Sequence, residues 1–221
     1  MTTDGTLLVQ DLADWGWPTP AAILIRHAER PPVTSLKEID HLELTEAGRA
    51  AARQLGRRLA HYPELRLIHS PILRCEQTAT AIASGAAEGG SEISEVRRES
   101  VLGGSYAIDR TRALTKADEL GSQFVRAWFS GALEPGLMRP LGESLREHVD
   151  LVRKGFETNT SGELLTVYVT HDWNVSVLRE GLFGIRYEEE GWPEYLDGVS
   201  FALFSGQLQC RFRKRVCPVV P

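Results

Sequence analysis

Three stretches of the sequence place polar residues, arginine and histidine among them, directly after apolar runs. In "AAILIRHAERPP", five apolar residues from Ala21 run into Arg26 and His27, and Arg30 follows three positions later. The stretches "LRLIHSPILRCEQ" and "VYVTHDWN" have a similar arrangement further along the chain. The polar residues that follow the three runs are Arg26, His27, Arg30, Ser70, Arg74, His171 and Asp172. Because arginine is costly to bury without a partner, its presence here indicates a negatively charged ligand.

The residue types fit a tetrahedral dianion, and phosphate is the best candidate. Each arginine offers a planar fork of donors that can bind two phosphate oxygens at once. A neutral histidine held by its other ring nitrogen can attack phosphorus and form a phosphohistidine, which water later hydrolyses. Flanking arginines would stabilise the charge on the equatorial oxygens in the transition state. The pattern therefore favours phosphoryl chemistry.

Three strand-and-helix units are predicted to position these residues. The runs "AAILI", "LRLIH" and "ELLTVYVT" predict buried strands. The first is followed by "LTEAGRAAARQLGRRLAHY", a predicted helix with Thr45 as its N-cap, and the second by a helix that Ser70 caps, with Pro71 in its first position. The third runs into a helix through "THDWN". Such units predict a parallel sheet, and ligands bind beyond the carboxyl ends of its strands, where these polar residues lie.

The rest of the chain predicts a cap and a C-terminal hairpin. "GAAEGGSEISE" is interpreted as an exposed loop, and residues 115–131 and 142–157 as helices of a small cap, within an insertion at about 84–160. Residues 198–216 alternate on both sides of "SGQ" and predict a hairpin. We expect a single α/β domain over residues 1–221, a three-layer α/β/α sandwich with a mostly parallel central sheet and a small helical cap.

Composition excludes several functional classes. The net charge of −5 argues against a general nucleic-acid or anionic-membrane surface. The sequence contains no run of eighteen apolar residues, so no membrane span is predicted. The N-terminal segment does not resemble a signal peptide, and we therefore interpret the protein as cytoplasmic. Cys75, Cys210 and Cys217 are odd in number and lack metal-ligand spacing, which argues against a disulfide framework or a zinc site. No cofactor motif occurs, and the oligomeric state is left open.

The segments "LIRHAERPP", "SPILRCEQTATAI" and "VYVTHDWN" resemble, in the same order, the signature segments of the histidine phosphatase superfamily, which includes phosphoglycerate mutases and histidine acid phosphatases. The resemblance spans roughly residues 22–178, and three motifs in order are more specific than any one alone. It implies that His27 is the nucleophile and that Arg26, Arg74 and His171 complete a phosphate pocket. One departure is Ala28, where the family usually has glycine.

The motifs mix features of two branches of that superfamily. Arg30, and the pair His171 and Asp172 with Asn174 two residues later, resemble the acid-phosphatase branch, in which the aspartate protonates the leaving group. "RRESVLGG" resembles the mutase-like branch, which places a glutamate in this role, here Glu99. Asp172 is the first choice for the general acid and Glu99 the alternative. The residues expected to bind substrate are Arg30, Ser70 and Asn174.

Two of these neighbourhoods also have simpler interpretations. Glu99 sits in the charged run "SEVRRES" and would then be a solvated side chain. Cys75 follows Arg74, whose charge can activate a thiol, but "SPILRCEQ" lacks the glycine-rich cradle that a cysteine phosphatase needs. We therefore expect Cys75 to be a small buried thiol.

Together these patterns predict a metal-independent phosphomonoesterase that hydrolyses a small phosphorylated metabolite through a phosphohistidine on His27. The alternatives are a phosphoryl-transferring mutase, and a module that binds phosphate or a phosphoprotein without turnover. The presence of both histidines and the arginines favours catalysis, since a pure binder does not need the nucleophile. Specificity is expected to lie in the loops and the cap, where no pattern identifies the substrate.

Overall fold

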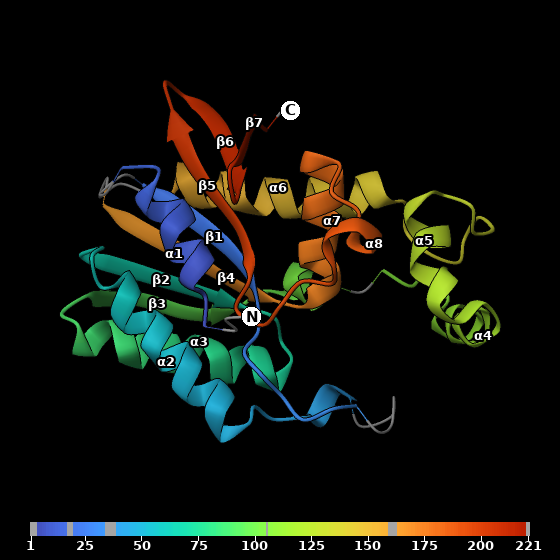
Figure 1. The fold of residues 1–221 in the computed structure, drawn as a ribbon, viewed down its shortest axis with the longest axis horizontal. Helices are drawn as coiled ribbons and strands as arrows, with labels where there is room; N and C mark the ends of the chain where they lie inside the picture. The colour runs from blue at the N-terminus through green and yellow to red at the C-terminus, as the bar shows by residue number, and fades with distance from the viewer. Residues whose placement is uncertain (1–3, 17–19, 34–38, 105, 159–162, 220–221) are drawn as a thin grey trace.

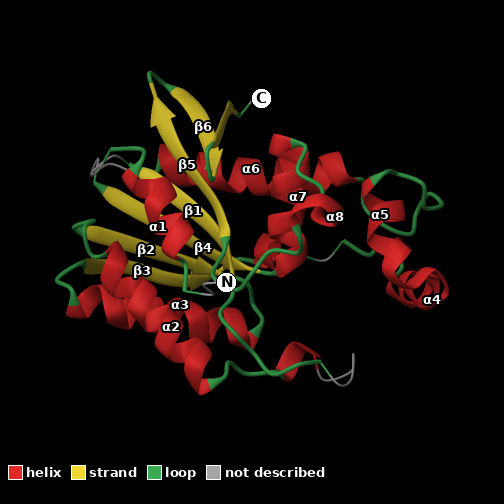
Figure 2. Ribbon diagram, viewed as in Figure 1, coloured by secondary structure: helices red, strands yellow, loops and turns green. Residues whose placement is uncertain are grey.

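The structure is a computed structural model that describes residues 4–16, 20–33, 39–104, 106–158 and 163–219. Within these ranges, seven strands form one mixed sheet in the order β3-β2-β4-β1-β5-β6-β7 (Figure 1). The strands are β1 (Ala21–Arg26), β2 (Glu64–His69), β3 (Glu92–Arg98), β4 (Leu164–Thr170), β5 (Gly198–Phe204), β6 (Gln207–Phe212) and β7 (Arg215–Pro218). Helices cover both faces of this sheet (Figure 2), so the predicted α/β fold is confirmed.

The parallel pairs are confined to one half of the sheet. β3, β2, β4 and β1 run parallel, with β4 between β2 and β1, so that Val167 pairs with both Leu67 and Ile23. β5 then pairs antiparallel with β1, and β6 and β7 continue antiparallel. Every residue of β1 and β4 is buried, which explains their continuous apolar runs. The predicted hairpin over residues 198–216 is confirmed as β5 and β6, with β7 added at the edge.

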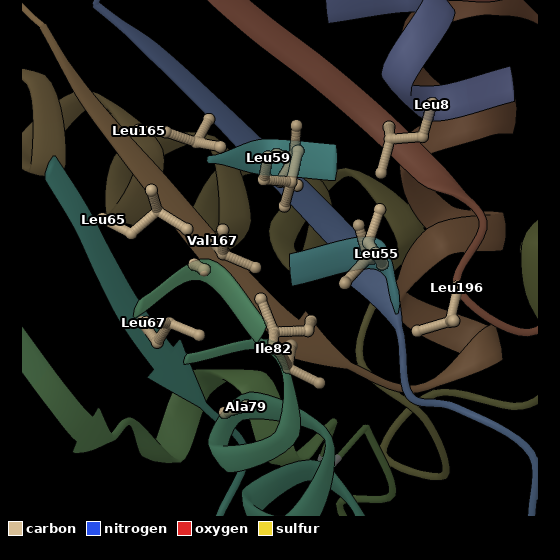
Figure 3. Close-up of a cluster of buried hydrophobic side chains, with 14 of the residues drawn as sticks. Leu8, Leu55, Leu59, Leu65, Leu67, Ala79, Ile82, Leu165, Val167 and Leu196 are labelled. Atoms are coloured by element: carbon tan, nitrogen blue, oxygen red, sulfur yellow. The ribbon is translucent and has the colours of Figure 1, made fainter. Parts of the chain in front are cut away.

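Two hydrophobic cores lie on opposite faces of the sheet. Successive residues of β1 alternate between them: Ile23 and Ile25 belong to one core, and Ala22 and Leu24 to the other. The helices over the first core, part of which Figure 3 shows, are α1 (Thr6–Ala13), α2 (Glu46–Leu59) and α3 (Leu73–Glu88). The helices over the second core are α6 (Leu141–Glu157) and α7 (Asp172–Phe183), after which comes the short α8 (Tyr187–Glu190).

Helix α2 has the predicted N-cap and packs closely on α3. The Thr45 hydroxyl accepts a hydrogen bond from the Gly48 N–H at 2.9 Å, as a capping side chain does. A Cβ atom at Gly56 or Gly85 would overlap the backbone of the opposite helix, so glycine lets the two helices approach each other. This contact fixes α3, which carries Arg74 in its first turn.

The segment after β3 forms a small aromatic cluster that projects from the sheet (Figure 1). Its core contains Phe124 and Trp128, and Trp173 of α7 packs against it, with ring centroids 6.4 and 5.3 Å from theirs. Among the described residues, no helix is both long and apolar enough to cross a membrane. The short helices outside the two main layers are η1 (Ile39–His41), η2 (Ser100–Gly103), α4 (Arg110–Leu120), η3 (Gly121–Gln123) and α5 (Phe124–Phe129).

The predicted insertion at 84–160 is only partly a cap. The exposed loop expected at "GAAEGGSEISE" is wrong, because α3 continues to Glu88 and the chain then enters β3. In β3, exposed and half-buried residues alternate, which is the pattern of an edge strand with one covered face. Helix α6 belongs to the covering layer, where Val149 and Val152 are buried against the second core. The projecting segment therefore lies between β3 and α6, and its role as a cap stays a prediction.

Candidate active site

The three motifs meet at the carboxyl ends of neighbouring parallel strands. His27 follows β1, and its N–H donates to the carbonyl of Thr170, the last residue of β4, at 2.8 Å. His171 follows β4 and is the N-cap residue of α7. Arg74 comes from the first turn of α3, the helix that follows β2. Because β4 lies between β2 and β1, the sheet order brings the three side chains together.

The Arg74 guanidinium joins the two histidines. Its Nε donates to His27 Nε2 at 3.0 Å, and its Nη2 lies 3.1 Å from His171 Nδ1. Its remaining nitrogen, Nη1, donates to the Ile39 carbonyl at 2.6 Å, so the side chain is held at three points. The two imidazole rings are 5.6 Å apart between centroids and inclined by 68°. Both rings therefore present acceptor nitrogens to one buried cation.

His27 is held in the neutral form that a nucleophile requires. Its Nδ1 lies 2.7 Å from the Ala28 carbonyl, which can only accept, so Nδ1 carries the proton and Nε2 the lone pair. Burial lowers the pKa of His27 well below its usual value, and His171, Arg74 and Arg26 act in the same direction. At neutral pH the ring thus has an unprotonated Nε2 facing Arg74.

His171 is neutral as well, in the opposite tautomer. Since Nδ1 accepts from Arg74, the proton lies on Nε2, which donates to the Ser70 hydroxyl at 2.8 Å. Burial, and next the charge of Arg74, lower the pKa of His171 to about 3, and Arg26 and Arg30 add to this effect. A ring without charge leaves the positive charge of the site on its arginines.

Ser70 orients His171 and does not cap α3. Its hydroxyl is fully buried, and it also accepts from the Ile72 N–H at 3.3 Å. Helix α3 begins at Leu73, with Ile72 as an N-cap that makes no side-chain hydrogen bond. The prediction that Ser70 caps a helix starting at Pro71 is therefore wrong, whereas its role in substrate binding stays a prediction.

Arg26 is fixed by a loop that sequence reasoning did not include. Its Nη1 donates to the Pro193 carbonyl at 2.6 Å, and its guanidinium carbon lies 4.0 Å from the centroid of the Tyr195 ring. The same ring has its centroid 5.8 Å from that of His27. No sequence pattern pointed to Tyr195, because it lies far along the chain in the loop after α8. Its contact with Arg26 makes it part of the site wall.

Three arginines give the site a positive charge. Arg30 is half-buried beside the histidines, and its Nη1 donates to the Pro31 carbonyl at 2.8 Å. Among the described atoms, the Nε groups of Arg26 and Arg30 are buried without a hydrogen-bond partner, so both retain a donor for a ligand. Burial lowers the pKa of Arg74 from its usual value. Three guanidiniums next to two neutral imidazoles suit a dianion.

Asp172 is the candidate acid that the structure brings to this site. It occupies the first position of α7, and its Oδ2 lies 3.2 Å from Arg26 Nη2. Its Oδ1 accepts from the Trp173 N–H at 2.9 Å. About a quarter of the side chain is exposed, at 24%, so the carboxyl group is accessible to a ligand and to water.

Glu99 is held by its own segment instead. It caps η2, accepting from the Val101 N–H at 3.4 Å, and its Oε2 lies 3.1 Å from Arg97 Nη1. Burial acts to raise the pKa of Glu99, but Arg97 and Val101 outweigh it and the net pKa is lowered. Its contacts within the described chain do not include the arginines or histidines of the site. The structure therefore does not bring the alternative acid into contact with these arginines and histidines.

Two further residues beside the motifs are fully buried. The Asn174 amide binds the hydroxyls of Tyr106 and Thr170 and the Leu102 carbonyl, and its role in substrate binding stays a prediction. These contacts join η2 and the projecting segment to α7. Cys75 is fully buried, and burial raises the pKa of its thiol to about 12, in agreement with the expected inert thiol. The described residues also include no cluster of metal-ligating side chains.

Comparison with known proteins identifies the fold and the family of the chain. Similar solved structures are a mycobacterial glucosyl-3-phosphoglycerate phosphatase (17% identity over 84% of this chain and 92% of that one, TM-score 0.56), a phosphoglycerate mutase from Bacillus anthracis (15%, 86% and 92%, 0.54) and the mycobacterial hydrolase 1 (17%, 91% and 97%, 0.59). At these identities they show a shared fold. No curated protein sequence matches the chain. The model of the histidine phosphatase superfamily (branch 1) matches residues 22–195, which include all three motifs, and the chain therefore belongs to this superfamily.

Proposed function

We propose that the chain is a phosphomonoesterase that hydrolyses the phosphate ester of a small metabolite through a phosphohistidine on Nε2 of His27. One observation carries the proposal: the Ala28 carbonyl fixes the Nδ1 proton of His27, so that its lone pair on Nε2 faces the arginines. A site that only bound phosphate would need the arginines but not a neutral imidazole in this orientation. The proposal also places this phosphatase in the cytoplasm.

In the first step, the phosphoryl group binds between Arg26, Arg30 and Arg74. In the free protein the Arg74 Nε–H donates a hydrogen bond to His27 Nε2. When substrate binds, a phosphate oxygen accepts this hydrogen bond instead, and the lone pair on His27 Nε2 becomes free to attack. The bond between Nε2 and phosphorus forms as the ester P–O bond breaks, and Asp172, acting as the general acid, gives a proton to the leaving oxygen. The guanidiniums stabilise the charge on the equatorial oxygens.

In the second step, water takes the place of the alcohol. The Asp172 carboxylate accepts a proton from this water as its oxygen attacks phosphorus, and the bond to Nε2 breaks. Inorganic phosphate leaves, and His27 and Asp172 return to the states in which the first step began. His171 takes no part in the proton transfers. Its Nε2–H donates a hydrogen bond to the Ser70 hydroxyl and its Nδ1 accepts one from Arg74, so in both steps it holds Arg74 in place.

The reaction differs from that of a mutase only in the final acceptor. Similar folds include both a phosphatase and a phosphoglycerate mutase. If a hydroxyl group of a second metabolite accepts the phosphoryl group, the first step is unchanged but no inorganic phosphate is released. Measuring free phosphate with and without added acceptor alcohols therefore distinguishes the two outcomes.

The proposal is tested by hydrolysis of an activated aryl phosphate in the presence of a chelator. The parent chain should release phosphate, and an acid-labile phosphoenzyme should be trapped by rapid denaturation after mixing with radiolabelled substrate. His27→Ala should lose both signals. If the parent binds phosphate but turns over no ester, the phosphatase proposal fails and a binding module is the better description. If turnover survives in His27→Ala, the nucleophile is a different residue.

A further inference from the structure

Two cysteines face each other across the last two strands of the sheet. Cys210 of β6 and Cys217 of β7 are direct register partners in the antiparallel pair, and their Sγ atoms lie 3.0 Å apart. Both are free thiols in this structure. The strands lie side by side at the edge of the sheet (Figure 1). No step of the proposed phosphatase reaction uses either thiol.

We propose that Cys210 and Cys217 form a reversible redox modification site that closes into a cross-strand disulfide. Register partners in antiparallel strands have Cα atoms about 4.5–5.5 Å apart, which lies within the range that disulfides bridge without moving the backbone. The sulfur atoms already point at each other. The bond therefore needs little more than removal of the two thiol hydrogens.

The two thiols differ in accessibility, which sets the order of the reaction. Cys210 is fully buried, and burial raises the pKa of its thiol, so it is a poor first nucleophile. Cys217 on the edge strand is half-buried and is therefore the more exposed of the two. It donates a weak hydrogen bond to the Leu182 carbonyl at 3.3 Å, which a thiolate would release. Cys217 is therefore the attacking thiol and Cys210 the resolving one.

The reaction is a thiol–disulfide exchange with a small-molecule disulfide such as oxidised glutathione. The Cys217 thiolate attacks one sulfur of the reagent, whose S–S bond breaks and releases one reduced thiol. Cys210 loses its proton and attacks Sγ of Cys217, which releases the second reduced thiol and forms the bond between Cys210 and Cys217. The protein pair is oxidised by two electrons, and one reagent disulfide is reduced to two thiols.

The crosslink would fix a hairpin that supports the loop around Arg26. Arg213, in the turn between β6 and β7, lies 2.8 Å from Asp197, whose carbonyl accepts the Arg26 N–H at 2.8 Å. The Arg213 N–H also donates to Asp11 at 2.9 Å. Because the closed loop spans few residues, we expect only a modest rise in Tm on oxidation.

The test is a redox titration of the purified full chain in glutathione buffers, read by intact mass after acid quenching and by alkylation of the unfolded protein. As the buffer becomes oxidising, the parent should lose two hydrogen masses and two of its three alkylatable thiols, and a reductant should restore both. Cys75 serves as the internal control, because it is fully buried on α3 and should remain alkylatable throughout. This readout does not depend on phosphatase activity, so either proposal can fail alone.

Two single variants distinguish formation of the disulfide from simple reaction of an exposed thiol. Cys210→Ser should stop at a glutathione adduct on Cys217, whereas Cys217→Ser should react much more slowly because Cys210 is buried. Equal thermal unfolding of parent and variants under reducing conditions would show that both fold. The proposal is overturned if the parent keeps three thiols in the most oxidising buffer, or if it accumulates the adduct without closing.

Discussion

Two junctions of this sheet each place a carboxylate just after a parallel strand, yet only one contributes to the candidate site. At the end of β4, Asp172 begins α7 and contacts Arg26. At the end of β3, Glu99 caps η2 and pairs with Arg97. β4 is flanked by β2 and β1, which carry the other motifs, whereas β3 is the edge strand of the parallel half. Position in the strand order, and not the residue type, decides which carboxylate meets the arginines.

Loss of activity on removal of His27 is the reference for comparing the two carboxylates, because Asp172 or Glu99 would act with the same nucleophile. His27→Ala should lower kcat/KM by about 10⁴-fold or more, since the covalent route is lost. The measurement is phosphate release from an aryl and an alkyl phosphate by the same preparations. The phosphoenzyme should also be absent. Retention of a trapped phosphoenzyme in this variant would refute the role of His27.

The sharpest test sets Asp172→Asn against Glu99→Gln. On an alkyl phosphate, whose leaving oxygen needs a proton, Asp172→Asn should lose roughly 10²- to 10⁴-fold in kcat, as expected for a general acid. Glu99→Gln should stay close to the parent. On an activated aryl phosphate, the Asp172 variant should lose much less, because that leaving group departs without protonation.

The two substrates also separate acid catalysis from an indirect effect through Arg26. Asp172 makes an ion pair with Arg26, so its loss could loosen that guanidinium. An indirect effect would reduce the rates on both substrates by the same factor. Equal losses would therefore remove Asp172 from the acid role, and a loss confined to the Glu99 variant would reverse the comparison of the two junctions.

A smaller effect is expected at Tyr195, the wall residue that stacks on Arg26. Tyr195→Leu should raise KM about tenfold with a smaller change in kcat, because a desolvated cation–π contact of about 1–2 kcal/mol holds Arg26 toward the phosphate. Tyr195→Phe keeps the ring and should behave like the parent. Steady-state kinetics on the aryl phosphate measure both constants. If the Phe and Leu variants lose activity equally, the hydroxyl group and not the ring is responsible.

Local sequence signals predicted the elements that hold the site. Thr45 capped α2 as expected, and the apolar runs before His27 and His171 are buried strands, because both patterns depend on interactions within a few residues. The convergence of the motifs also followed from one general property of parallel sheets. The family resemblance then led to the arginines and histidines that the structure brings together.

Sequence patterns do not show the direction of a side chain that depends on distant contacts. Ser70 and Asn174 stand beside the motifs, but His171 engages the first and Tyr106 the second, and both are fully buried. The exposed loop expected over residues 85–95 is wrong because this segment holds the end of α3 and the start of β3, where charged residues on both faces obscure a two-residue alternation. Tyr195 had no local signal at all. Tertiary packing, which a single sequence does not display, decides these positions.

A further effect is expected on the pH dependence of stability, and it distinguishes the neutral histidines from the carboxylates. The pKa of His171 is lowered to about 3 in the folded chain, so between about pH 6.5 and 3 the unfolded chain binds a proton that the folded chain does not. Stability should therefore fall as the pH drops through this window. Asp11, whose pKa burial raises to about 6, opposes this between pH 6 and 3.8, where the folded chain holds the extra proton.

Thermal unfolding of the parent and of His171→Gln from pH 7.5 to 4 measures this contribution. The glutamine variant removes the titrating ring, so its Tm should decrease less steeply below pH 6.5 than that of the parent, whatever its Tm at pH 7.5. Asp11→Asn should change the slope in the opposite direction. Parallel curves for parent and His171→Gln would mean that His171 takes up a proton in the folded chain over the same pH range as in the unfolded chain. The positive charge of the site would then not rest on its arginines alone, and the tautomer that orients Arg74 would be lost.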